Sequence, residues 1–174
     1  METAPMTWAQ FCFLISCLGG CFQVIAVEPD MLLKARFVAR FVQLTEWPPP
    51  PPTRFRYCVA GNTPLLQALQ QTKLHSSQGE PLQIEAIEQP AQALTCQLLI
   101  LSLDQHAELI RWQQQLAATP LLVITDNSEA FHSLAVIGLI TEPDGISFRI
   151  NHSLAQQRGL KLSSQLLKLA REVI

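Results

Sequence analysis

The residues of this chain that could do chemistry are few, and the cysteines are the most informative of them. The chain has five cysteines, of which three precede residue 27. If the first 26 residues are removed on export, Cys58 and Cys96 remain as an even pair in an oxidising compartment. A bond between them would close a loop of about 39 residues and stabilise the fold by about 4 kcal/mol. The alternative is two buried free thiols, each packing as a small apolar residue.

No arrangement of residues in the sequence is typical of a catalytic centre or a metal site. A cysteine nucleophile needs a positioned base, and neither cysteine of the pair has a histidine nearby in sequence. The histidines are scattered, without the spacing of zinc ligands: His75, His106, His132 and His152. The turn at 61–64 lacks the further glycines and the lysine of phosphate-binding loops. We therefore expect no catalytic residue, no metal, no cofactor and no enzymatic activity.

Four polar residues near the end of the chain could contact a ligand or a partner protein. On the predicted strand 146–151, Arg149 and Asn151 face the side opposite to the apolar residues. Lys161 and Ser163 precede the last predicted helix, where a cation, a cap and backbone donors could hold an anion or a partner's carboxylate. The alternative is that these polar side chains are simply solvated.

A fifth candidate, Trp47, lies at the end of the first predicted helix. That helix covers 31–44, where Arg36, Arg40 and Gln43 recur at i, i+4 and i+7 as one polar stripe on an otherwise buried helix. Trp47 then precedes a run of five prolines, which cannot continue a helix. We expect Trp47 either to pack in the core or to anchor a partner.

The segments that follow are predicted strands of one sheet. Nearly continuous apolar runs at 96–101 and 120–126 are typical of buried parallel strands. The alternation at 82–88 indicates a half-buried edge strand, and 135–140 with 146–151 form a hairpin around an Asp-Gly turn. Because helices alternate with the strands, we predict an α/β fold: one three-layer domain with a mixed, mostly parallel sheet and helices on both faces.

Three helical segments are predicted in the second half of the chain. One extends from about 104 to 118 with Ile110 on its apolar face, and a shorter one is capped by Ser128. The final helix carries an apolar stripe made of Leu162, Leu166, Leu169 or Ala170, and Val173. That stripe would pack in the core or form the seam of a homodimer.

The first 26 residues are predicted to be a signal peptide, which leaves 27–174 as the domain. The apolar run at 11–22 has the length of a signal-peptide core, and Val24-Ile-Ala26 supplies a cleavage sequence. The first ten residues carry no Lys or Arg, which is atypical of such leaders. There are two alternatives. The chain could be a lipoprotein, because Leu14-Ile-Ser-Cys17 has the order of a lipidation signal, or the segment could be an uncleaved anchor.

The composition limits the classes of partner. Hydrophobic residues make up 48% of the chain and charged residues 15%, which argues against disorder. The formal net charge is -2, so the chain has no basic surface for nucleic acid or anionic lipid. Recognition of a partner must therefore depend on local features of a surface.

Several short motifs, in order over residues 31–173, resemble the YfiR family of bacterial periplasmic proteins. They are Glu46-Trp47-Pro48, Tyr57-Cys58-Val59, Cys96-Gln-Leu-Leu-Ile100, Leu122-Val-Ile-Thr-Asp126, and the closing block from Phe148 to Arg171. The resemblance implies one exported α/β domain, often dimeric. It also implies that Cys58 and Cys96 correspond to a cysteine pair of the family, whereas a second pair found in some relatives is absent.

The resemblance further implies a regulatory function without turnover. Such proteins inhibit a diguanylate cyclase of the inner membrane through its periplasmic part, which lowers cyclic di-GMP and restrains biofilm formation. We therefore expect a membrane-anchored diguanylate cyclase as the partner, a possible homodimer and no binding of nucleic acid. The alternative is a periplasmic small-ligand sensor that feeds a membrane signalling protein.

Overall fold

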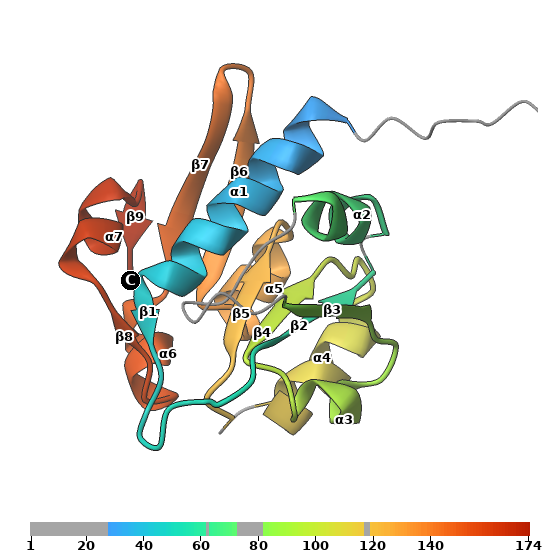
Figure 1. Ribbon diagram of the computed structural model, residues 1–174, viewed down its shortest axis with the longest axis vertical. Coiled ribbons are helices and arrows are strands. Elements are labelled where there is room, and N and C mark those ends of the chain that lie inside the picture. The colour runs from blue at the N-terminus through green and yellow to red at the C-terminus, as the bar shows by residue number, and fades with distance from the viewer. Residues whose placement is uncertain (1–27, 62, 73–81, 117–118) are drawn as a thin grey trace, which may run out of the picture.

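The computed structural model describes residues 28–61, 63–72, 82–116 and 119–174. These residues fold into a central sheet with helices on both faces and a projecting hairpin (Figure 1). The predicted signal peptide lies outside the described residues. Within the part of the chain that is described, no helix is both long enough and apolar enough to span a membrane.

Seven strands form the central sheet, in the order β3-β2-β4-β5-β6-β7-β9. Their bounds are β2 (Arg56–Ala60), β3 (Gln83–Ala86), β4 (Leu98–Leu101), β5 (Leu122–Thr125), β6 (Ile137–Glu142), β7 (Gly145–Ile150) and β9 (Glu172–Val173). Neighbouring strands are parallel except for β6 and β7, which form the antiparallel hairpin. The predicted mixed, mostly parallel sheet is therefore confirmed.

The centre of the sheet is formed by the two most apolar segments of the sequence. Every residue of β4 and β5 is buried, because helices cover both faces at this point. By contrast, β3 lies at one edge with a half-exposed pattern, as its alternating sequence predicts. Apolar periodicity therefore predicts both the existence of these strands and their place in the sheet.

Two buried clusters separate the layers. On one face, α1 (Pro29–Gln43) and α2 (Thr63–Gln71) pack on the sheet, and a ring contact of 4.8 Å joins Phe41 of α1 to Phe148 of β7. On the other face lie α3 (Pro90–Ala93), α4 (His106–Leu116) and α5 (Ser128–Ser133). This is the predicted three-layer arrangement, and the stripe of Arg36, Arg40 and Gln43 is exposed on α1 as expected.

A second, two-stranded sheet joins the beginning of the domain to its end. In it, β1 (Thr45–Glu46) pairs antiparallel with β8 (Lys161–Leu162). The flanking helices α6 (His152–Gln157) and α7 (Ser164–Leu169) contribute Ala155 and Leu166 to the same cluster as α1. The C-terminal segment therefore packs on the first helix of the domain.

The predicted stripe on the last helix is wrong in its second half. Helix α7 ends at Leu169, and the chain then becomes extended and pairs with β7 as strand β9. The backbone N–H groups of Arg171 and Ile174 donate to carbonyl oxygens of β7 over 2.9 Å each. Leu169 is 65% exposed and Val173 is 45% exposed, so these two residues do not join Leu162 and Leu166 in the core. Ala170, the alternative to Leu169 in the predicted stripe, is partly buried and packs against that core.

Two smaller predictions about helices are also corrected. Ile110 is 40% exposed on α4, because the helix turns Leu109 and Trp112 toward the sheet instead. Helix α5 is capped by Asn127 rather than Ser128, since the Asn127 side chain accepts the N–H of Ala130 at 2.9 Å.

Candidate functional site

Polar side chains meet where the parallel strands β4 and β5 end. The Lys34 Nζ of α1 lies 3.4 Å from Oδ2 of Asp126, which follows β5. The hydroxyl of Ser102, which follows β4, donates to Oδ1 of the same carboxylate at 2.8 Å. Residues from three elements therefore converge on one carboxylate at the carboxyl edge of the sheet.

Burial makes Lys34 the unusual member of this cluster. The residue is only 6% exposed, although an ammonium group carries three donors and is costly to bury unpaired. Among the described residues, its one hydrogen-bonding acceptor is Asp126. The Asp126 side chain is 30% exposed, so the cluster reaches solvent through the carboxylate.

The cluster lies beside the point where the chain changes direction in the sheet. The chain leaves β2 through α2 on one face and leaves β4 through α4 on the other face. In open α/β sheets, ligands bind outside the carboxyl ends of strands at such a point. Gly61, directly after β2, lies close to the polar cluster, because a Cβ added to Gly61 would lie 2.1 Å from the backbone oxygen of Ser102.

Near one edge of the sheet, the cysteine pair forms the expected disulfide. Cys58 lies on β2 and Cys96 lies two residues before β4, with their Cα atoms 6.1 Å apart. Both residues are buried, and Glu85 of β3 lies beside them, with its Oε1 3.7 Å from the Cys58 sulfur. Arg56 forms an ion pair with Glu85 on the solvent side. The bond joins the chain across β2 and β4.

Arg149, one of the predicted partner-binding residues, packs against α5. Its guanidinium carbon lies 4.4 Å from the centre of the Phe131 ring, which is a cation–π geometry. One terminal nitrogen is 3.4 Å from the Ser128 hydroxyl, and the buried Nε has no hydrogen-bond partner. Gly138 leaves room for this stack, since a Cβ there would lie 2.7 Å from the same ring.

Asn151 and Ser163 use their side chains as helix caps. The Asn151 side chain accepts the Leu154 N–H at 2.8 Å at the start of α6. The Ser163 hydroxyl accepts the Leu166 N–H at 3.2 Å at the start of α7. These acceptors stabilise short helices that complete the C-terminal segment.

Lys161 and Trp47 lie close to each other through the β1–β8 pair. Lys161 is exposed and faces Glu46 across the two strands, and Trp47 directly follows Glu46. Trp47 is half-buried and stacks edge-on against Phe55 at 5.1 Å, with its indole Nε1 buried and unpartnered. The structure thus brings Trp47, Lys161 and Ser163 into one region, whereas Arg149 packs on the opposite face of the sheet.

A nearby buried cation, Arg158, was not singled out from the sequence. It is 4% exposed, ends α6 and donates to the backbone oxygen of Leu121 at 3.3 Å. Burial away from water lowers the pKa of Arg158 to about 10. Burial likewise raises the pKa of Tyr57 on β2 above its usual range. Both side chains belong to the interior of the fold.

Three exposed apolar residues lie at or next to the β9 edge of the sheet. The described residues include five exposed large hydrophobic side chains, and three of them, Leu169, Val173 and Ile174, fall within the last six residues of the chain. Strand β9 covers only Arg149 and Ile150 of β7, so the outer half of β7 has β6 as its one strand partner in the described chain. We call the three apolar residues on this edge the β9 patch.

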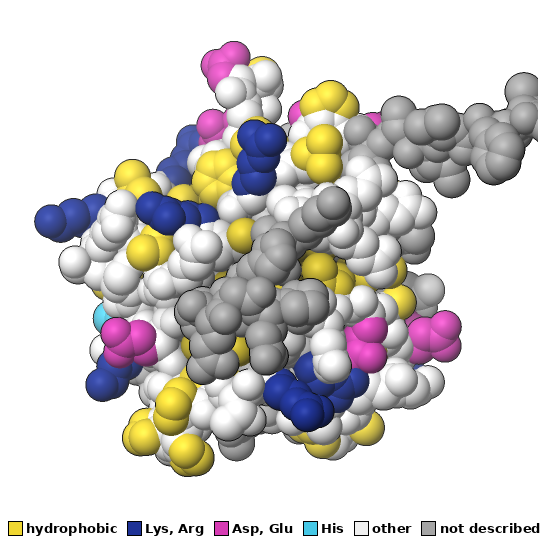
Figure 2. Space-filling view, viewed as in Figure 1, with side chains coloured by type: hydrophobic (Ala, Val, Ile, Leu, Met, Phe, Trp, Pro, Cys, Tyr) yellow, Lys and Arg dark blue, Asp and Glu magenta, His cyan; other side chains and the backbone are white. Residues whose placement is uncertain are grey.

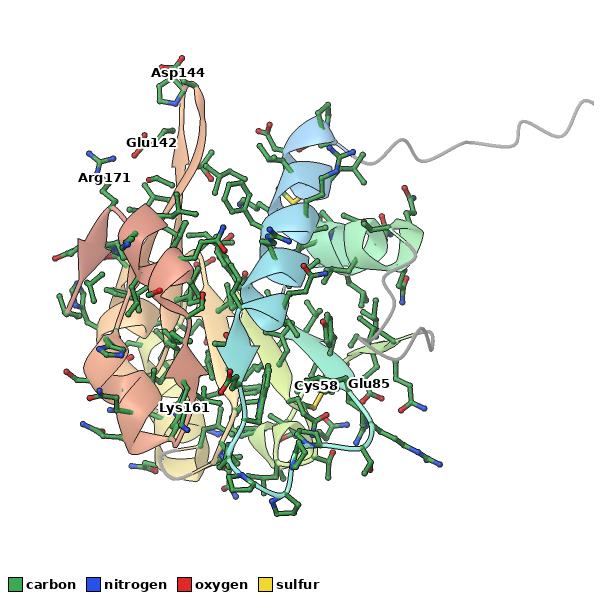
Figure 3. The ribbon with its side chains drawn as sticks, turned by 60° about the vertical axis from the view of Figure 1, so that its left-hand side comes forward. Cys58, Glu85, Glu142, Asp144, Lys161 and Arg171 are labelled. Carbon is green, nitrogen blue, oxygen red and sulfur yellow. A yellow bond between two sulfur atoms is a disulfide. The ribbon has the colours of Figure 1, made fainter. Side chains whose placement is uncertain are left out.

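The hairpin beyond this edge carries charge. Figure 2 shows acidic side chains at its tip and basic side chains over α1. In Figure 3, Glu142 lies on the hairpin near Arg171, Asp144 lies at the hairpin tip, and Lys161 lies toward the other end of the molecule. Arg171 forms an ion pair with Glu142, which joins the hairpin to the chain just before β9. Charged groups therefore border the β9 patch on its outer side.

Comparison with known proteins gives the fold and the family separately. No curated protein matches the sequence. A solved structure described as a conserved domain protein from Vibrio cholerae is similar, with a TM-score of 0.54 and 11% identity. The match covers 83% of this chain but 60% of that one. At this identity the likeness shows a shared fold alone.

The family is given by sequence. A profile of the family described as YfiR/HmsC-like matches residues 32–171. The matched range begins in α1 and ends just before β9, so it includes the disulfide, both buried clusters and the C-terminal segment. The chain therefore belongs to the YfiR/HmsC-like family.

Proposed function

We propose that this protein is an exported regulator that binds a membrane-anchored diguanylate cyclase and represses it without turnover. The chain belongs to a family of periplasmic regulators. Repression would lower cyclic di-GMP and restrain biofilm formation, which is the activity that the family resemblance implies.

The observation that carries this proposal is the β9 patch. Leu169, Val173 and Ile174 are 65%, 45% and 43% exposed, and they adjoin an open sheet edge. Exposed apolar side chains beside an unpaired strand are typical of a surface that a partner covers. The bordering Arg171, Glu142 and Asp144 would provide polar contacts at the rim of such an interface. Lys161, Trp47 and Arg149 remain further candidates for partner contact.

A substitution within the β9 patch tests this proposal. We expect Leu169→Asp with Val173→Asp to weaken cyclase binding by at least about 30-fold, because charges replace apolar anchors. In a deletion strain that expresses the partner cyclase, the wild-type gene should lower cyclic di-GMP and the double variant should not. Quantification of cyclic di-GMP by mass spectrometry gives the measurement.

The matched control is Leu94→Asp, which introduces the same charge at a residue that is 44% exposed after α3. This variant should repress like the wild type. If deletion of the gene leaves cyclic di-GMP unchanged while the cyclase is expressed, the repressor proposal is wrong. If Leu94→Asp abolishes repression as strongly as the double variant, the β9 patch is not the interface.

A second candidate function, a small-ligand sensor, is favoured by the buried Lys34 at the carboxyl edge of the sheet. A ligand with an acidic group would supply acceptors to the remaining N–H groups of its ammonium. Screening small acids by thermal shift should then reveal a saturable rise in melting temperature. Lys34→Met should lose that rise, whereas Lys168→Met, at an exposed lysine of α7, should keep it. A screen without any such ligand would exclude this candidate.

A further inference from the structure

The two disulfide cysteines and a neighbouring glutamate form a group of three potential metal ligands. One ligand atom from each of Cys58, Glu85 and Cys96 lies within 4.8 Å of the other two. In Figure 3, Cys58 and Glu85 lie side by side on β2 and β3, next to the yellow disulfide bond. No other group of three such residues converges in the described part of the chain.

The sheet register holds these groups together. Cys58 and Glu85 are direct partners across the parallel strands β2 and β3, so their side chains project from the same face. Cys96 is positioned by the turn before β4, where its N–H donates to the Ala93 oxygen at 3.0 Å. Two of the three ligands therefore lie on paired strands, and a hydrogen-bonded turn holds the third, so their positions do not depend on the sulfur–sulfur bond alone.

The ligand set suits a thiophilic divalent ion. Thiolates select zinc over magnesium or calcium, and a carboxylate is a common third ligand. A zinc–sulfur distance of about 2.3 Å places two tetrahedral thiolates about 3.8 Å apart. Because the Cα atoms of Cys58 and Cys96 are 6.1 Å apart, side-chain rotation can provide that separation.

Charge also favours a divalent ion. Two thiolates and the Glu85 carboxylate carry three negative charges, and Arg56, paired with that carboxylate, supplies one positive charge. A divalent ion balances the remaining charge of the cluster. The Glu85 side chain is 41% exposed, which gives the ion a path from solvent and leaves a fourth position for water.

We propose that Cys58, Cys96 and Glu85 form a zinc site when the disulfide is reduced. A dithiol reductant would transfer two electrons and two protons to the sulfur–sulfur bond and become a disulfide itself. The two thiols would then release two protons as they bind Zn²⁺ together with Glu85. The disulfide and the zinc site are alternative states of one pair of cysteines, and neither depends on the function proposed above.

Titration of the full chain with Zn²⁺ tests the proposal. One sample keeps the disulfide, and the other is reduced with a phosphine that is removed without air. Calorimetry in two buffers of different ionisation enthalpy gives the stoichiometry and the number of protons released. We expect one ion per reduced chain, with close to two protons released, and no binding to the oxidised chain. Equal binding to both forms, or none to the reduced form, would overturn the proposal.

Variants separate this site from nonspecific binding to thiols. Cys96→Ser should abolish high-affinity binding, and Glu85→Gln should weaken it at least about tenfold. Glu88→Gln, at an exposed carboxylate just beyond β3, is the matched control and should bind like the wild type. If reduction unfolds the chain, zinc should restore its circular dichroism, and Glu85→Gln should require more zinc. Identical titrations of Glu85→Gln and the wild type would contradict the site.

Discussion

Replacing both Cys58 and Cys96 with alanine is expected to lower the free energy of unfolding by about 4 kcal/mol, measured by urea denaturation. The bond closes a loop that contains α2 and β3, so its loss frees that part of the unfolded chain. Both cysteines are buried, and the small cavities left by alanine would add to the cost. Such a loss is a large share of the stability of a typical domain.

Reduction of the wild-type protein provides the control for this prediction, because it removes the bond without changing a side chain. In the absence of metal, the reduced wild type should unfold at a slightly higher urea concentration than the double alanine variant, because it keeps both sulfur atoms and has no added cavity. A loss below about 1 kcal/mol in both would show that the bond is not a main stabilising element.

Gly61→Ala is expected to destabilise the protein by at least about 3 kcal/mol. Two costs add at this position. The backbone has φ +85, which alanine adopts only with strain, and the added Cβ would lie 2.1 Å from the Ser102 backbone oxygen. Because the clash is with backbone, the end of β4 must move. Thermal and urea unfolding measure the loss.

Gly145→Ala is the matched comparison for this substitution. Gly145 also has a positive φ, of +147, but a Cβ there would meet no atom within 4 Å. This variant therefore measures the backbone strain with little of the steric clash. If the two variants lose the same stability, the close approach of β2 to the end of β4 is not tightly constrained.

The sequence predicts the sheet well because apolar runs are direct evidence of burial. The runs at β4 and β5, and the turn between β6 and β7, are local patterns that need no knowledge of distant residues. The layers follow from these strands, since each face of a buried sheet must be covered by helices. The family resemblance is consistent with the same local segments, and the profile match confirms it.

The end of the chain shows where periodicity is insufficient. An apolar residue at 173 fits both a helical repeat with Leu166 and an extended strand. Hydrogen bonds to the carbonyls of Phe148 and Ile150 decide in favour of the strand. Such bonds depend on an unpaired edge of β7, which no short window of sequence reveals. The exposure of the β9 patch was missed for the same reason.

The polar cluster at the carboxyl edge was missed because its partners are distant in sequence. Lys34 lies outside the predicted polar stripe of its helix, and its acceptor, Asp126, is 92 positions away. Asn151 and Ser163 illustrate the converse case, since polar residues before a helix are often caps. Their role as caps depends on where α6 and α7 begin.

The pairing of β1 with β8 has a consequence for how the protein folds. Helix α1 is made early in synthesis, but β8 and α7, which pack around its end, are made last. Such long-range contacts cannot form until the ribosome has nearly completed the chain, and they slow folding. Helix α2, which also packs on α1, is made soon after it, so only the end of α1 that β8 and α7 cover stays exposed until synthesis is nearly complete.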